Sequence, residues 1–144
     1  MTSYLSHSLL TFFFLIGAAP AQSFKPCDSK VAFVDRNMID YTIRVRTLRG
    51  SITDPDGVAV PKDCVALFNS DHSKLLQTVQ ANKNGDFAMA GVGNGDYWLV
   101  VQDPQRAFCP AAAHVKVRWY ARKSMILAHM EGTGIDRCSY CGTR

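Results

Sequence analysis

The sequence predicts an all-β protein, a sandwich of about seven short strands in one domain. Apolar and polar residues alternate with a period of two in several segments, which is the pattern of half-buried strands. Clusters of Gly, Pro, Asn and Asp separate these segments at intervals typical of a sandwich. Beyond residues 1–21, no segment has the apolar period of an amphipathic helix.

The 144-residue chain begins with a segment that we interpret as a secretory signal peptide, residues 1–21. Residues 9–18 form an apolar run too short to span a bilayer, and the small residues Ala19 and Ala21 stand where a signal peptidase cuts. An uncleaved anchor is the alternative. Cleavage would leave a secreted or periplasmic protein without a membrane span. It would consist of a lead-in segment (22–41), the sandwich (42–131) and a C-terminal tail (132–144).

The first predicted strand covers residues 41–53, where Ile43 and Val45 alternate with polar residues. Gly50 within it indicates a bulge or a close approach of two backbones. Further strands are predicted over residues 63–69, 74–80, 87–90, 97–101, 114–120 and 124–130. The inward face of the last strand stays open, because both of its faces carry apolar residues.

Two Asn-Gly-Asp turns, at residues 84–86 and 94–96, organise the middle of the chain. An Asn-Gly pair between strands is the strongest local hairpin signal, since both residues accept positive φ at low cost, so a hairpin is expected at residues 82–86. After the second turn, Tyr97, Leu99 and Val101 share one strand face and are expected to point inward. Trp98 would then point outward and indicate a binding surface, unless the lead-in segment or the tail covers it.

Five cysteines, at positions 27, 64, 109, 138 and 141, follow the predicted signal peptide. In an exported protein they are expected to form disulfides, and the odd number leaves at least one thiol free or paired with another chain. Cys138 and Cys141 have the CxxC spacing of redox and zinc sites, but no helix start and no second ligand pair accompanies them. We therefore interpret this pair as a structural tie of the tail.

The formal net charge of +4 gives weak attraction to polyanions and is too small to indicate nucleic-acid binding. A basic and aromatic patch is predicted from Lys116, Arg118 and Tyr120, extended by cations at positions 122 and 123 and joined by those at 44 and 46. In such a patch the rings stack on a ligand while the cations hold its acidic groups. The alternative is a solvated face whose Lys and Arg protect a sheet.

The acidic turns at residues 54–56 and 82–86 resemble part of a calcium loop, because oxygen-bearing side chains recur at alternate positions before a Gly. The glutamate that would complete such a loop is missing. Asn, Asp and Gly are also what bare turns require. We predict bare turns here, with no metal and no cofactor.

Several motifs together resemble the carboxypeptidase regulatory-like domain. They are Leu-Arg-Gly-Ser-Ile-Thr-Asp-Pro-Asp-Gly-Val-Ala-Val-Pro at 48–61, Val-Ala-Leu at 65–67, Thr78, Asn-Gly-Asp-Phe at 84–87, Gly-Val at 91–92 and Gly-Asp-Tyr-Trp-Leu-Val-Val at 95–101. The match covers roughly residues 46–130. The resemblance implies a prealbumin-like fold, a seven-strand antiparallel Greek-key sandwich. The segments at 108–110 and 136–140 resemble small secreted bacterial members, which implies a Cys109–Cys138 disulfide.

This family occurs as an accessory module of peptidases, adhesins and outer-membrane receptors, so the resemblance implies a non-catalytic exported module that binds a protein or serves the cell envelope. The alternative is a carbohydrate-binding module of starch-binding-like fold, with Trp98, Trp119 or Tyr120 stacking on sugars. A second alternative is a transthyretin-like hydrolase, whose site uses histidines, an arginine and a terminal Tyr-Arg-Gly-Ser. Residues 140–144 read Tyr-Cys-Gly-Thr-Arg and depart from that motif, so no enzyme is predicted.

Overall fold

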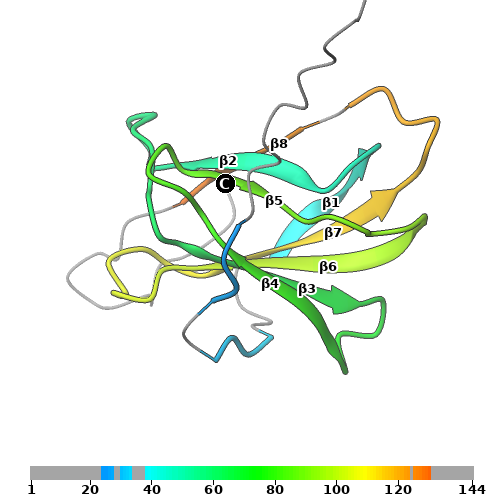
Figure 1. The fold of residues 1–144 in the computed structure, drawn as a ribbon, viewed down its shortest axis with the longest axis horizontal. Helices are drawn as coiled ribbons and strands as arrows, with labels where there is room; N and C mark the ends of the chain where they lie inside the picture. The colour runs from blue at the N-terminus through cyan, green and yellow to red at the C-terminus, as the bar shows by residue number, and fades with distance from the viewer. Residues whose placement is uncertain (1–23, 28–29, 34–37, 124, 131–144) are drawn as a thin grey trace, which may run out of the picture.

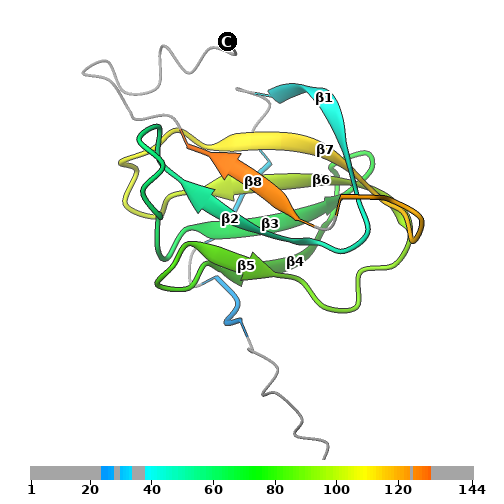
Figure 2. The same ribbon diagram turned by 90° about the horizontal axis from the view of Figure 1, so that it is seen from above.

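The computed structural model describes residues 24–27, 30–33, 38–123 and 125–130, which form an all-β fold of two facing sheets (Figures 1 and 2). The larger sheet has five strands in the order β1-β7-β6-β3-β4. They are β1 (Met38–Val45), β3 (Cys64–Asn69), β4 (Leu75–Gln80), β6 (Gly95–Gln102) and β7 (Ala111–Val117). The smaller sheet, in the order β5-β2-β8, contains β2 (Arg49–Thr53), β5 (Asp86–Ala88) and β8 (Ile126–His129). Within these residues there is no helix that could cross a membrane.

Both sheets are mixed, which corrects the prediction of an antiparallel fold. In the larger sheet β3 pairs antiparallel with β4 and β6, and β6 with β7, whereas β1 runs parallel to β7. In the smaller sheet β2 runs antiparallel to β5 and parallel to β8. The described residues form eight strands, not seven, because the predicted strand over 41–53 is two strands in different sheets. Arg46 and Thr47 are both exposed, so the period-two alternation breaks between them and the chain crosses to the other sheet.

The main core lies between the two sheets. Its buried residues include Val65, Leu67 and Leu99 from the larger sheet and Ile52, Phe87 and Ile126 from the smaller. The predicted faces of β6 are confirmed, since Tyr97, Leu99 and Val101 belong to this core while Trp98 and Val100 lie on the opposite face. In β8, Ile126 and Ala128 face the core, which settles the face that the sequence leaves open.

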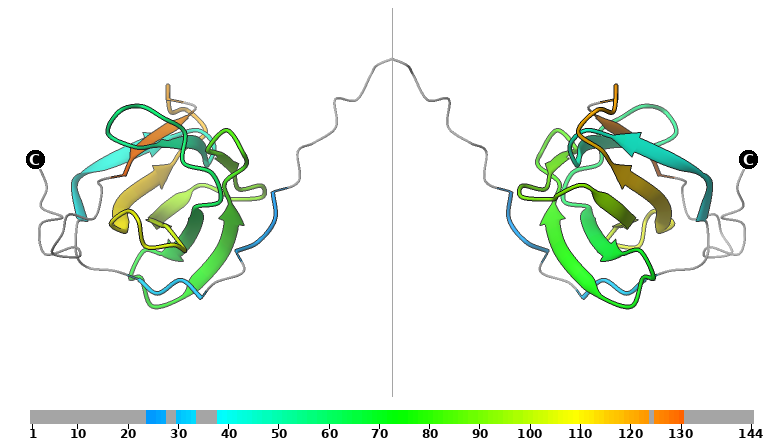
Figure 3. Two further views of the ribbon diagram at one scale, coloured as in Figure 1. Left: turned by 90° about the vertical axis from the view of Figure 1, so that its left-hand side faces the viewer. Right: turned by 90° about the vertical axis from the view of Figure 1, so that its right-hand side faces the viewer.

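A second, smaller core covers the outer face of the larger sheet. Val31 from the lead-in segment is buried there against residues of β3, β6 and β7, namely Cys64, Ala66, Phe68, Val100 and Ala112. A Cys27–Cys64 disulfide and a hydrogen bond from the Gln80 amide to the Lys25 carbonyl (2.7 Å) fix the segment in place. Figure 3 shows it in blue, outside the green strands of this sheet. The lead-in segment, which the sequence analysis places outside the sandwich, therefore contributes Val31 to this second core.

The turn at residues 82–86 has the predicted local chemistry but a different role. The Asn82 side-chain oxygen accepts hydrogen bonds from the Asn84 and Asp86 amides (2.8 and 2.9 Å), and Gly85 has a φ of +75°. The flanking strands do not pair, since β4 belongs to the larger sheet and β5 to the smaller. The expected hairpin is thus a turn that carries the chain between sheets.

Gly50 allows β2 and β8 to approach closely, which confirms one of the two predicted reasons for a glycine there. A Cβ atom at this position would lie 2.1 Å from the Ile126 carbonyl oxygen and 2.9 Å from the Phe87 ring. Since real Cβ atoms do not approach a backbone oxygen so closely, only glycine fits between these strands.

Candidate interaction surface

The β1–β2 and β7–β8 connections meet at one end of the two-sheet fold (Figure 1). The Arg118 amide donates to the Val45 carbonyl, and the Arg46 amide donates to the Lys123 carbonyl, both at 2.9 Å. These bonds bring together the residues that the sequence analysis assigns to a basic and aromatic patch. We call this set, to which the structure adds Trp119, the basic-aromatic end; its members are Arg44, Arg46, Lys116, Arg118, Trp119, Tyr120, Arg122 and Lys123.

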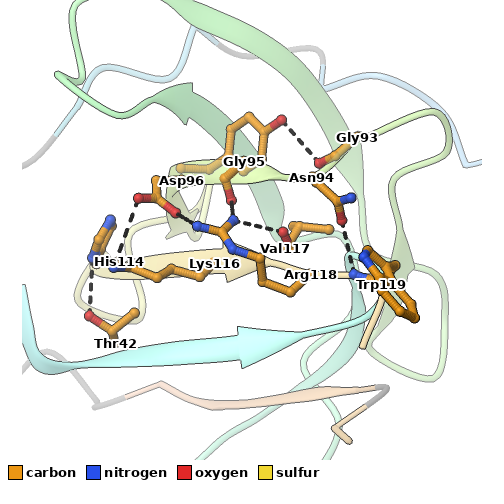
Figure 4. Close-up of polar contacts among 11 residues, drawn as sticks. Thr42, Gly93, Asn94, Gly95, Asp96, His114, Lys116, Val117, Arg118 and Trp119 are labelled. Atoms are coloured by element: carbon orange, nitrogen blue, oxygen red, sulfur yellow. Dashed lines mark hydrogen bonds and ion pairs between the residues drawn. The ribbon is translucent and has the colours of Figure 1, made fainter. Parts of the chain in front are cut away.

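Asp96 organises the cations nearest the sheet (Figure 4). It accepts a hydrogen bond from the Arg118 guanidinium (2.6 Å), and the Lys116 ammonium lies 3.8 Å from its other oxygen. The same guanidinium donates to the backbone carbonyls of Gly95 and Val117 (2.9 and 2.8 Å). The hydrogen bond from Arg118, together with the two positive charges, holds the pKa of Asp96 below its usual value. Arg118 therefore fixes the shape of this end as well as its charge.

Trp119 and Tyr120 project from the turn that follows β7. They are 72% and 63% exposed, and their rings are perpendicular with centroids 5.6 Å apart. The Trp119 amide donates to the Asn94 side-chain oxygen (2.9 Å), and the Ala121 amide donates to the Arg118 carbonyl (2.9 Å). The backbone that carries these two large rings is thus tied to the β5–β6 connection, while the rings themselves face solvent.

Four further cations belong to the basic-aromatic end. Arg44, Arg46, Arg122 and Lys123 are exposed, and among the described residues no carboxylate forms an ion pair with them. The described carboxylate nearest to this set in the β6–β7 register, Asp96, is already engaged by Lys116 and Arg118. The end consequently presents uncompensated positive charge next to exposed aromatic surface.

Trp98 does not belong to this end. It is half-buried on the outer face of the larger sheet, where its indole nitrogen donates to the Ser70 carbonyl (3.1 Å). Its ring contacts Phe33 of the lead-in segment at 5.6 Å and His114 at 5.2 Å between centroids. The lead-in segment thus covers Trp98, which was the structural alternative to a binding role.

In the part of the chain that the structure describes, the histidines and the acidic turns do not gather into a catalytic or metal-binding site. His114 pairs with Thr42 (3.1 Å) and His129 with Thr53 (2.9 Å), whereas His72 stacks on Phe33. No group of three or more His, Cys, Asp or Glu residues that could hold a metal occurs there. The terminal motif at 140–144, on which the hydrolase comparison rests, lies outside the described residues.

The turn oxygens that resemble calcium ligands have backbone partners. The Asp54 carboxylate accepts hydrogen bonds from the amides of Asp56 (3.0 Å) and Val58 (2.8 Å), and Asn82 serves its own turn in the same way. Gly57 adopts a φ of +80° at the end of the first turn. Local turn chemistry therefore accounts for these residues.

The disulfide pairing of the cysteines matches the sequence analysis only in part. Cys27–Cys64 is a disulfide that the analysis does not foresee. Cys109 is buried and disulfide-bonded, but Cys138 lies outside the described residues, so their pairing stays a prediction. Cys141 and the CxxC spacing also lie outside them.

Comparisons with known proteins assign no family. Neither a protein-family model nor a curated protein matches the chain. The resemblance to the carboxypeptidase regulatory-like domain therefore stays a prediction from motifs, and the function has to be argued from the surface itself.

Proposed function

We propose that the protein is an exported, non-catalytic module that binds an acidic segment of a partner protein through the basic-aromatic end. The proposal includes cleavage of residues 1–21 and a prealbumin-like, Greek-key sandwich of the carboxypeptidase regulatory-like type. It rests on one observation above all: Trp119 and Tyr120 are 72% and 63% exposed and stand among unpaired cations. Large aromatic residues that are exposed side by side commonly mark a binding surface.

The residue types favour a protein partner. Trp, Tyr and Arg are the residues most enriched among those that dominate protein–protein binding energy. The hydrogen bonds that tie the Trp119 backbone to Asn94 and the Arg118 side chain to Asp96 limit the entropy lost on binding. The cations of this end, Arg44, Arg46, Arg122 and Lys123, select a partner segment rich in Asp and Glu and raise its rate of association.

The test measures binding of the mature chain to peptides rich in Asp and Glu, at low and at high salt. We expect Trp119→Ala to weaken binding about tenfold or more, in line with the loss of a central aromatic anchor. Val58→Ala is the matched control, because Val58 is 62% exposed but lies in the β2–β3 connection at the other end of the fold (Figure 1). Equal affinities for the two variants, or binding that does not weaken with salt, would contradict the proposal.

A carbohydrate ligand is the second candidate, because the same two rings offer stacking faces for sugars. Their perpendicular arrangement lets a sugar ring stack on one of them rather than across both. A glycan array with the native protein, Trp119→Ala and Val58→Ala separates the candidates. Sugar binding that is lost only in Trp119→Ala, without binding to acidic peptides, would replace the protein partner by a glycan.

A further inference from the structure

Two aspartates are buried at the end of the fold opposite the basic-aromatic end. Cys64 pairs with Gln102 in the antiparallel register of β3 and β6, so Asp63, which precedes Cys64, stands opposite Asp103, which follows Gln102. Asp63 is 1% exposed and Asp103 is 6% exposed, and they are the two buried polar residues of the described chain. Residues opposite each other in such a register direct their side chains to the same face of the sheet.

Both carboxyl oxygens of Asp103 accept hydrogen bonds from backbone amides. One of its oxygens accepts a hydrogen bond from the Gln105 amide (2.8 Å), and the other accepts from the amides of Ala107 (2.6 Å) and Phe108 (3.2 Å). These bonds wrap residues 103–108, which we call the Asp103 loop, around the carboxylate. Phe108 at its end packs against the main core, so the loop closes this end of the fold.

Asp63 has the opposite surroundings. Both of its carboxylate oxygens are buried, and neither accepts a hydrogen bond. A buried carboxylate without a donor is strongly disfavoured in its charged form. Burial, reinforced by the negative charge of Asp103, raises the pKa of Asp63 from 3.8 to about 7. A neutral Asp63 carries an O–H donor, and the carboxylate opposite it is an acceptor.

We propose that Asp63 is buried as the neutral acid opposite Asp103, and that its proton keeps the Asp103 loop closed over the core. Removal of the proton leaves two negative charges in a buried site where only Asp103 has donors. The loop then opens to bring one carboxylate into water, since residues 104–107 are already exposed. The pair is a pH-sensitive latch, closed in acid and loosened as the pH rises through neutrality.

The described cations beside the pair do not share its buried site. Asp103 is the one charge that perturbs Asp63. The neighbouring cation Lys62 and the loop cation Arg106 both have exposed side chains. The strand end that packs beside Asp63 contributes Gln80 and Ala81, neither of which titrates, and Cys109 beyond the loop is disulfide-bonded. Protonation of Asp63 is therefore what allows the two carboxyls to be buried together.

The experiment compares the stability of the native protein and of Asp63→Asn between pH 4 and pH 9. Because the folded pKa lies above the unfolded value, stability is full at low pH and is lost as the pH rises. We expect the folding equilibrium constant of the native protein to fall about a thousandfold relative to that of Asp63→Asn across this range. Asp56→Asn, which changes an exposed carboxyl, is the matched control and should follow the native protein.

Hydrogen exchange of the Gln105, Ala107 and Phe108 amides in the native protein supplies a second measurement that needs no variant. Protection of these amides, corrected for the intrinsic pH dependence of exchange, should decrease above neutral pH. The proposal would be overturned if the stability of the native protein and of Asp63→Asn varied with pH in parallel. If that variant does not fold, protection of the loop amides that stays unchanged with pH would overturn it. A rise in melting temperature with millimolar calcium, absent in Asp63→Asn, would also overturn it, because a cation rather than a proton would then join the carboxyls.

Discussion

Removal of the Cys27–Cys64 disulfide should both destabilise the protein and uncover Trp98. The two cysteines are 37 residues apart. In the chain-entropy model, a crosslink over a loop of this length stabilises the folded state by about 4 kcal/mol, because it restricts the unfolded chain. We therefore expect the double variant Cys27→Ala, Cys64→Ala to lose about 4 kcal/mol of unfolding free energy, measured by urea denaturation with the m-value fitted separately for each protein.

The same variant tests how the lead-in segment is held. Without the disulfide, the interactions left to attach the segment are the hydrogen bond between Lys25 and Gln80 and the apolar contacts of Val31 and Phe33. The described residues before β1, 24–27 and 30–33, form no strand pairing and have little to offset the entropy of their attachment. The segment should detach from the sheet and leave the Trp98 ring in water.

Acrylamide quenching of Trp98 fluorescence measures this exposure in a Trp119→Phe background, since these are the two tryptophans of the chain. Substitution is preferable to chemical reduction, because reduction would also break the disulfide of Cys109. Equal unfolding midpoints and equal quenching with and without the disulfide would refute the reasoning. Lower stability with unchanged quenching would show that apolar contacts alone keep the segment in place.

Two further predictions concern the sheet contact and the charged end. Gly50→Ala should cost about 3 kcal/mol or more in thermal unfolding, because the new methyl group meets a carbonyl oxygen of β8. Gly93→Ala has free space at the corresponding Cβ and should stay within about 0.5 kcal/mol of the native protein; similar losses for both would contradict the steric argument. Arg118→Ala should raise the pKa of Asp96 toward 3.8, followed by carboxyl NMR titration, and an unchanged pKa would show that the hydrogen bond is not its cause.

Local patterns in the sequence are sufficient to predict where the strands and turns of this fold lie. Alternation in residues 97–101 predicts both faces of β6, and the chemistry of Asn82 and Gly85 predicts a tight turn. They are not sufficient for the pairing of strands. The same Asn-Gly turn serves a hairpin or a passage between sheets, and the choice depends on the long-range partners of β4 and β5. The period-two break at Arg46 and Thr47 is the local signal that would have divided the first strand.

The candidate site also has features that follow from local sequence and features that depend on long-range strand pairing. The gathering of Tyr120 with cations could be anticipated, because these residues are near neighbours in the sequence. Exposure of Trp119 could not, because the predicted strand over 114–120 puts it in phase with the buried Val115 and Val117, whereas β7 ends at Val117. The engagement of Arg118 by Asp96 could not, since it requires the register of β6 against β7. The segment that covers Trp98 is joined to β3 by a disulfide whose pairing no cysteine spacing determines.

The placement of the two tryptophans explains why only one of them is a binding candidate. Trp98 lies in the middle of β6, where the lead-in segment packs on the sheet and the indole contributes to that packing. Trp119 follows the last residue of β7, where the sheet ends and no described element covers the ring. The hydrogen bond to Asn94 stabilises the backbone at that point without burying the indole. Since a ring that is held in place and left in water gains most from a partner, the binding experiments should begin at Trp119.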